Sequence, residues 1–194
     1  WDKGNARLFA GGNFYAPVGS DLPEHIAVWD GSAWASVSYG ARTTVDALLW
    51  DDVSQHLYAS GDFGAPGEPW AIRAIGMWDG TEWTALGSGF HTGEVRALAW
   101  DPGSGRLFIG GNFRRAGDAS ESGFAIWDGN ELTLMGNDQI STGIHTLTWD
   151  AKHGRLFAGG SMAINDTHVS EKLVSWDGEH WSGTRDGVNG TVQA

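Results

Sequence analysis

The triplet Trp-Asp-Gly occurs at residues 29–31, 78–80, 127–129 and 176–178, each time after an interval of 49 residues. Two further series keep nearly the same spacing. Trp-Asp recurs at 1–2, 50–51, 100–101 and 149–150, and Leu followed by Phe or Tyr recurs at 8–9, 57–58, 107–108 and 156–157. Three series in phase over the 194 residues indicate four repeats of one unit. We place these repeats at about 1–44, 45–94, 95–143 and 144–194.

The third repeat shows the local pattern most plainly. Apolar residues alternate with small or polar ones at 95–100, which is the period of a β-strand. Short apolar runs follow at 106–111, 124–127 and 131–135. The Asp-Gly pair between the last two runs is typical of a tight hairpin. We find no sustained 3.6-residue apolar period anywhere in the chain and therefore expect almost no helix.

Four short antiparallel strands in every repeat predict an all-β protein, and specifically a β-propeller built of four-stranded blades. Each sheet of a propeller packs against both neighbours, so both faces of its middle strands must be apolar. The runs 8–11 and 26–29 meet that requirement. A doublet of small residues, which contains at least one Gly, ends the second strand of each repeat. It removes bulk where two sheets approach closely.

The order of these motifs resembles kelch repeats and the galactose-oxidase type of propeller. In kelch repeats a Gly doublet ends one strand, and an aromatic-Asp hairpin then closes on a Trp. The closing residue here is Trp34, Trp83 or Trp181, with Leu132 in the third repeat. The resemblance covers all four repeats and implies a propeller of the kind found in secreted and cell-surface repeat proteins. The oxidase activity itself requires a Cys crosslinked to a Tyr, and the chain has no Cys.

Trp1 stands in the register of Trp50, and residues 192–194 stand in the register of 45–47 and 95–97. We therefore expect about four blades that form part of a larger propeller. Further blades of the same chain, or another copy, would complete it. Closure of the four repeats on themselves is the alternative, since propellers have about four to eight blades.

Residues fixed in every repeat are expected to be structural. Eleven of the twelve Trp stand at repeat positions and are predicted to pack in the core. The Asp of each hairpin is predicted to accept backbone N–H bonds in its turn. The structural repeat residues are Trp29, Trp78, Trp127, Trp176, Asp30, Asp79, Asp128 and Asp177.

The variable loops are where a binding surface is expected, because loops on a rigid scaffold carry recognition. Trp70 is the exceptional Trp and lies in such a loop, where an aromatic ring can stack on a sugar or a partner chain. Arg114, Arg115 and Asp118 occupy the matching loop of the third repeat. Solvated loop polarity is the competing interpretation for all four residues.

The composition and the motifs of the chain argue against several classes of function. The net charge of -12 disfavours nucleic-acid binding, and no apolar run is long enough for a membrane helix. No metal-ligand motif, phosphate-binding loop or nucleophile elbow is present, so we predict no cofactor and no metal, with a weak Ca²⁺ site left open. Asn165 and Asn189 begin glycosylation sequons. Together with the composition they agree with an extracellular or cell-surface protein.

The sequence therefore predicts a non-enzymatic propeller that acts as a scaffold or protein-interaction module. The alternative is a glycan-binding propeller that uses loop aromatics such as Trp70. A third hypothesis is an enzyme whose catalytic residues lie mainly in blades outside this segment.

Overall fold

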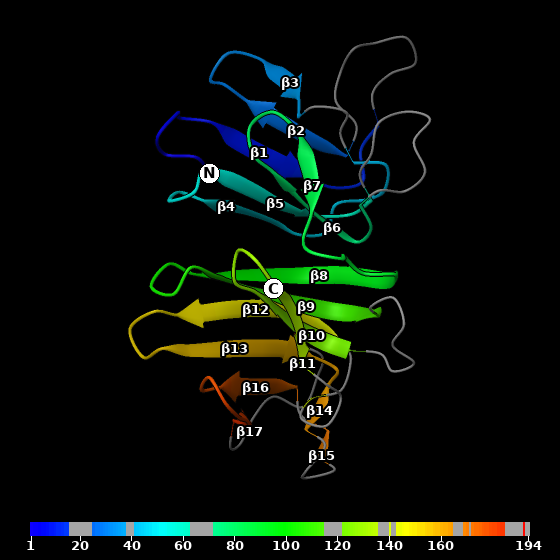
Figure 1. Ribbon diagram of the computed structural model, residues 1–194, viewed down its shortest axis with the longest axis vertical. Coiled ribbons are helices and arrows are strands. Elements are labelled where there is room, and N and C mark those ends of the chain that lie inside the picture. Colours follow the sequence, from blue (N-terminus) through cyan, green and yellow to red (C-terminus); the bar gives the residue numbers. More distant parts are fainter. Residues whose placement is uncertain are drawn as a thin grey trace. The chain divides into compact units, whose positions relative to one another are not determined.

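The computed structural model describes residues 1–15, 25–37, 41–62, 72–114, 122–135, 140, 143–164, 169–170, 172–184 and 192 (Figure 1). These residues form antiparallel β-sheets, and no helix occurs among them. The prediction of an all-β protein is therefore confirmed.

Each repeat forms one sheet, and the sheets are named I to IV in chain order. Sheet I contains β1 (Leu8–Gly11), β2 (Ile26–Trp29) and β3 (Trp34–Ser36). Sheet II contains β4 (Leu48–Asp51), β5 (His56–Ser60), β6 (Ile75–Trp78) and β7 (Trp83–Ala85). Sheet III contains β8 (Thr92–Asp101), β9 (Arg106–Arg114), β10 (Ser122–Trp127) and β11 (Leu132–Met135). Sheet IV contains β12 (Ile144–Asp150), β13 (Arg155–Gly160), β16 (Leu173–Trp176) and β17 (Trp181–Gly183). A two-stranded ribbon, β14 (Ala163–Ile164) with β15 (Val169–Ser170), lies between β13 and β16 in the sequence.

Every sheet is a simple meander in which consecutive strands pair, apart from the ribbon that interrupts sheet IV. Sheet I differs from the others at one edge. Sheets II, III and IV begin with β4, β8 and β12, whereas sheet I has only the isolated bridge between Asp2 and Arg7 beside β1. Among the described residues, β1 is therefore an edge strand whose outer side lacks a ladder partner.

The chain divides into two compact units, Trp1–Gly89 with sheets I and II and Phe90–Ala194 with sheets III and IV. The predicted boundary between the second and third repeats, at residues 94 and 95, falls inside β8. The strand begins earlier than its apolar alternation because β8 continues pairing with β9 through Thr92, beyond the register shift between Val95 and Ala97.

One face of each sheet carries a row of large apolar residues that stand opposite one another on adjacent strands, which we call the Trp row. In sheet IV the row is Trp149, Leu156, Trp176 and Trp181. In sheet II it is Trp50, Leu57, Trp78 and Trp83. In sheet III it is Trp100, Leu107, Trp127 and Leu132. Sheet I has Leu8, Trp29 and Trp34, and the Asp2–Arg7 bridge places Trp1 opposite Leu8.

The opposite face of each sheet carries the aromatic residue that follows the Leu, and we call it the Phe face. In the first unit the Phe face of sheet I packs on the Trp row of sheet II. The ring of Phe9 stacks on Trp50 with centroids 5.2 Å apart and meets the edge of Trp78 at 5.9 Å. Ile26, Leu57 and other buried residues complete this core.

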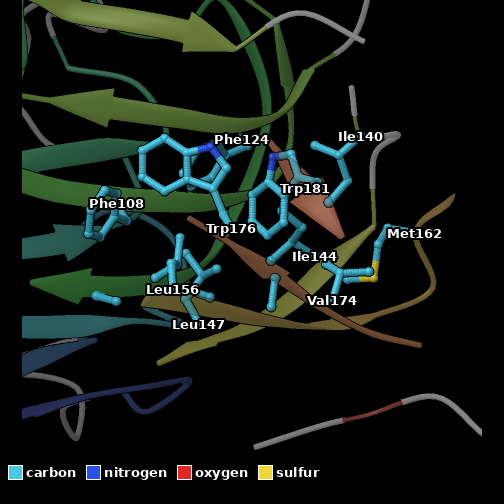
Figure 2. Close-up of a cluster of buried hydrophobic side chains, with 13 residues drawn as sticks. Phe108, Phe124, Ile140, Ile144, Leu147, Leu156, Met162, Val174, Trp176 and Trp181 are labelled. Carbon is cyan, nitrogen blue, oxygen red and sulfur yellow. The ribbon is translucent and has the colours of Figure 1, made fainter. Parts of the chain in front are cut away.

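The second unit repeats that contact between sheets III and IV. Phe108 lies 5.1 Å from Trp149 and 5.6 Å from Trp176, measured between ring centroids. Phe124 adds edge contacts to Trp176 and Trp181 at 5.7 and 5.1 Å. Figure 2 shows the rings of Phe108, Phe124, Trp176 and Trp181 in one cluster, with Phe108 at one side and Ile140 and Met162 at the other.

The Gly doublets stand where successive sheets approach most closely. A Cβ added to Gly11 would lie 2.5 Å from Cγ1 of Val45, and one added to Gly110 would lie 2.5 Å from Cγ2 of Ile144. Val45 and Ile144 are equivalent residues of the following repeats, so a side chain of the next sheet fills the space above each Gly. Sheets I and II, and sheets III and IV, are therefore joined in the same way.

Candidate functional site

The Asp of each Trp-Asp-Gly triplet organises a hairpin turn. The Oδ1 atom of Asp30 accepts hydrogen bonds from the backbone N–H groups of Ser32 and Ala33 at 2.8 and 2.9 Å. Asp79, Asp128 and Asp177 accept the equivalent pairs of backbone bonds. The following Gly has a positive φ of 95–110° in all four turns, a conformation that favours glycine.

These bonds stabilise the charged form of each carboxyl, so they lower its pKa. The hydroxyl of Thr81, followed by the backbone N–H groups of Glu82 and Thr81, lowers the pKa of Asp79 to about 2. Backbone bonds from Ala33, Glu131 and His180 are the leading causes of the lowered pKa values of Asp30, Asp128 and Asp177. A carboxylate that is held charged in this way is a turn element and a poor general acid or base.

A second Asp series opens the turn after the first strand. Asp51 and Asp2 are fully buried. Asp51 accepts from the backbone N–H groups of Val53 and Ser54. Burial raises the pKa of Asp2, but hydrogen bonds from Asn5 and Arg7 outweigh it and the net pKa is lowered. The Arg7 guanidinium donates to Asp2 at 2.7 Å and also lies over the rings of Phe9 and Trp50. This series also stabilises the fold.

The predicted ligand-binding residues fall mostly on segments that the structure does not describe. Trp70, Arg115 and Asp118 lie outside the described residues, as do the sequon residues Asn165 and Asn189. Arg114 is described, and it is half-buried at the end of β9, where its carbonyl accepts a hydrogen bond from the backbone N–H of His91. Sequence reasoning placed Arg114 at the start of a loop, whereas the strand continues through it.

A polar cluster that the sequence analysis missed joins the first strands of sheets III and IV. Arg96 on β8 donates from Nη1 to Nε2 of His145 on β12 at 3.1 Å. Its Nη2 donates to Glu94 at 2.7 Å. Arg96 and Glu94 remain 40% and 63% exposed. Because a guanidinium can only donate, Nε2 of His145 is the acceptor of this bond.

A signal for this cluster existed in the sequence. Arg96 and His145 are equivalent residues of successive repeats, and Asp46 and Gln193 occupy the same position in the others. The residue before each of them is Val or Ile in every case. A position that varies beside one that does not is typical of a solvent-facing residue on a strand whose other face is buried. The pairing itself required knowledge that β8 and β12 are neighbours.

The Trp row of sheet I contains three large hydrophobic side chains that are exposed among the described residues. Trp1, Leu8 and Trp34 are 57, 41 and 44% exposed. Trp29 is half-buried and its ring lies 5.6 Å from that of Trp34. The prediction that repeat-locked Trp residues are core residues is wrong for Trp1 and Trp34. Trp78, Trp127 and Trp176 are buried at 8, 7 and 3% exposure.

The described residues contain no group of three or more His, Asp or Glu side chains arranged to hold a metal ion. Within the same residues no helix has the length and apolarity needed to span a membrane. No protein-family model matches the chain, and no curated protein matches it. The resemblance to kelch and galactose-oxidase repeats stays a prediction.

Proposed function

We propose that the chain is a segment of a β-propeller that acts as a non-enzymatic scaffold or protein-interaction module of an extracellular or cell-surface protein. The observation that carries this proposal is the exposed Trp row of sheet I. Large aromatic side chains in a contiguous exposed row are typical of a surface that binds another macromolecule.

The hairpin turns support the non-enzymatic part of the proposal. In all four sheets the repeated carboxylate is occupied by backbone donors of its own turn. The repeated polar residues are therefore explained by the fold alone. The non-repeated cluster of Glu94, Arg96 and His145 offers an oriented but exposed guanidinium, which suits a polar contact at the rim of an interface.

Glycan binding is the alternative, and the exposed indoles of Trp1 and Trp34 favour it alongside Trp70, since aromatic faces also stack on sugars. A glycan array with the wild-type chain and the Trp70→Ala and Trp34→Ala variants tests the choice. We expect no saturable binding to any glycan. Saturable binding that either variant abolishes would replace the scaffold proposal by a lectin. Binding that survives both substitutions would also contradict the scaffold and would place the glycan site elsewhere.

A further inference from the structure

The exposed Trp row of sheet I has a counterpart inside the molecule at each sheet junction that the two units contain. Phe9 of sheet I lies against Trp50 and Trp78 of sheet II. Phe108 of sheet III lies against Trp149 and Trp176 of sheet IV. Both junctions use one rule, in which the Phe face of one sheet covers the Trp row of the next. Trp1 and Trp29 are the residues of sheet I equivalent to Trp50 and Trp78.

Sheet IV presents a Phe face that follows the same rule. Phe157 is the equivalent of Phe9 and Phe108, and it is half-buried, whereas those two residues are 8% and 1% exposed. Leu173 on the neighbouring strand is also half-buried. This face therefore keeps accessible the aromatic ring that its equivalents bury between two indoles.

Val192 marks where a following sheet would start on this face. A Cβ added to Gly159 would lie 2.6 Å from Cγ1 of Val192. Val45 stands over Gly11 and Ile144 over Gly110 in the same way, and each leads into the first strand of the next sheet. The contact between Gly159 and Val192 therefore continues the series of sheet junctions beyond sheet IV.

We propose that the chain associates head to tail with a second copy of itself, so that the Phe face of sheet IV in one copy covers the Trp row of sheet I in the other. Phe157 then lies between Trp1 and Trp29 of the second copy, as Phe108 lies between Trp149 and Trp176. This inference rests on the proposed function as an interaction module and names its partner. It assigns a use to two faces that otherwise expose aromatic side chains to water.

The free edge of β1 strengthens the same junction. In sheets II, III and IV the strand beside β5, β9 and β13 begins near Val45, Val95 or Ile144. Among the described residues of sheet I, only Asp2 pairs on that side, through its isolated bridge to Arg7. Val192 of the copy that supplies sheet IV then lies at this free edge, as Val45 and Ile144 lie at or shortly before the start of β4 and β12. Such an interface is heterologous, and it closes into a ring or extends as a chain of copies.

The first test is the mass of the 194-residue chain in solution. It is measured by light scattering after size-exclusion chromatography at about 100 µM, where an affinity in the micromolar range populates the complex. We expect a mass at least twice the 20.8 kDa of one chain. Leu8→Glu puts a charge into the Trp row and should weaken association at least about tenfold. Val53→Glu is the matched control, because Val53 is 78% exposed in a turn of sheet II outside both faces.

A mixing experiment identifies the head-to-tail arrangement. Leu8→Glu leaves the Phe face intact, and Phe157→Glu leaves the Trp row intact. Each variant alone should associate at least about tenfold more weakly than the wild-type chain, and an equimolar mixture should form a dimer with about the wild-type affinity through the two intact faces. A symmetric interface that pairs like faces would give no such recovery. Circular dichroism confirms folding, and Trp34→Glu and Val192→Asp replace any variant that fails to fold.

A monomeric wild-type chain at that concentration overturns the proposal. So does association that Leu8→Glu leaves unchanged, association that Val53→Glu abolishes equally, or a mixture that stays monomeric. A monomer whose Trp34 is shielded from a soluble quencher would show that the chain closes on itself and would also overturn it. None of these outcomes changes the result expected from the glycan array. A failure of self-association can therefore be distinguished from a failure of the scaffold proposal.

Discussion

Sheets I and IV carry the same row of residues in the same register, yet one row is exposed and the other is buried. Leu156, Trp176 and Trp181 are 0, 3 and 7% exposed, whereas Leu8 and Trp34 are 41 and 44% exposed. The strands that the two sheets share pair in the same register, since Leu8 stands opposite Trp29 as Leu156 stands opposite Trp176. The difference comes from Phe108 and Phe124 of sheet III, which cover the row of sheet IV.

Burial in this protein is therefore a property of the junction between two sheets. A single repeat forms hairpins and a pleated sheet from its own residues, but its Trp row meets water until the preceding sheet supplies a Phe face. This is the nearest-neighbour behaviour expected of repeat proteins, in which the interface between units supplies much of the stability. The same sequence motif then serves as a core in one place and as a binding surface in another.

Substituting equivalent Trp residues tests this comparison with the largest expected effect. Trp176→Ala removes a buried indole from the III–IV junction and should lower the free energy of unfolding by about 3–5 kcal/mol. Trp34→Ala should cost only about 1 kcal/mol because nearly half of its side chain is already in water. Urea denaturation followed by circular dichroism measures both values, at a protein concentration low enough to keep the chain monomeric. Equal losses would contradict the comparison.

Trp176→Phe is the control for the polar part of the indole. The Nε1 atom of Trp176 is buried and donates to no acceptor among the described residues. Phe keeps much of the apolar contact and removes that unpaired donor, which itself costs stability. The loss on Trp176→Phe should therefore be much smaller than the loss on Trp176→Ala. A loss of the same size would show that the N–H group has a partner after all.

The Gly doublets allow a second test, of intermediate size. Gly110→Ala places a methyl group 2.5 Å from Ile144 and 3.0 Å from Leu147, so sheets III and IV must separate or strain. We expect a loss of about 1–3 kcal/mol, as for overpacked cores. Gly12→Ala is the matched control, because its nearest atom belongs to the Phe14 ring at 3.6 Å and the change should stay within about 0.5 kcal/mol. Thermal unfolding of both variants measures the two losses of stability. Losses of similar size would contradict the close approach of the sheets at Gly110.

The local elements could be predicted from the sequence because their causes are local. The Asp-Gly pair at 128–129 fixes a hairpin, and the alternation at 95–100 fixes most of β8, which extends from Thr92 to Asp101. The variable loop of the third repeat was expected to include Arg114, and this placement was wrong. β9 includes Arg114 and β10 begins at Ser122, since Ser122 still pairs with Phe113 beyond a bulge.

The sequence could not show which sheets lie next to each other or which side chains one sheet covers on another. Trp34 and Trp181 occupy the same position in the repeat, so no local signal separates the exposed residue from the buried one. The contact between Arg96 and His145 likewise requires β8 and β12 to be neighbours. Met162 stands where other repeats have Phe. It is fully buried in the core between sheets III and IV, because its flexible side chain fills the space that remains.

Substitutions in the hairpin turns should have the smallest effects. The turns are the internal standard for comparing the exposed sheet I with the covered sheet IV, because they depend on hydrogen-bond donors of their own residues and not on a covering sheet. The pKa of Asp79 is about 2, below its ordinary 3.8, and the hydroxyl of Thr81 is the leading cause. Asp128 has the same two backbone bonds but no such hydroxyl. Thr81→Val should therefore raise the pKa of Asp79 and leave that of Asp128 unchanged, as measured by NMR titration of the side-chain carbons.

The sign of the pH dependence follows from the direction of this shift. A carboxyl whose pKa is lower in the folded chain stabilises the fold fully above the unfolded value, and the contribution disappears as pH falls through the folded value. For Asp79 that window runs from about pH 4 down to about pH 2. Asp30 and Asp177, with lowered pKa values, should lose their contributions on the same acid side. Unequal acid sensitivity of Asp30→Asn and Asp79→Asn, whose carboxylates each accept from two backbone N–H groups and one hydroxyl, would mean that the covering of sheet II reaches its turn. The separation of local from junction effects would then be wrong.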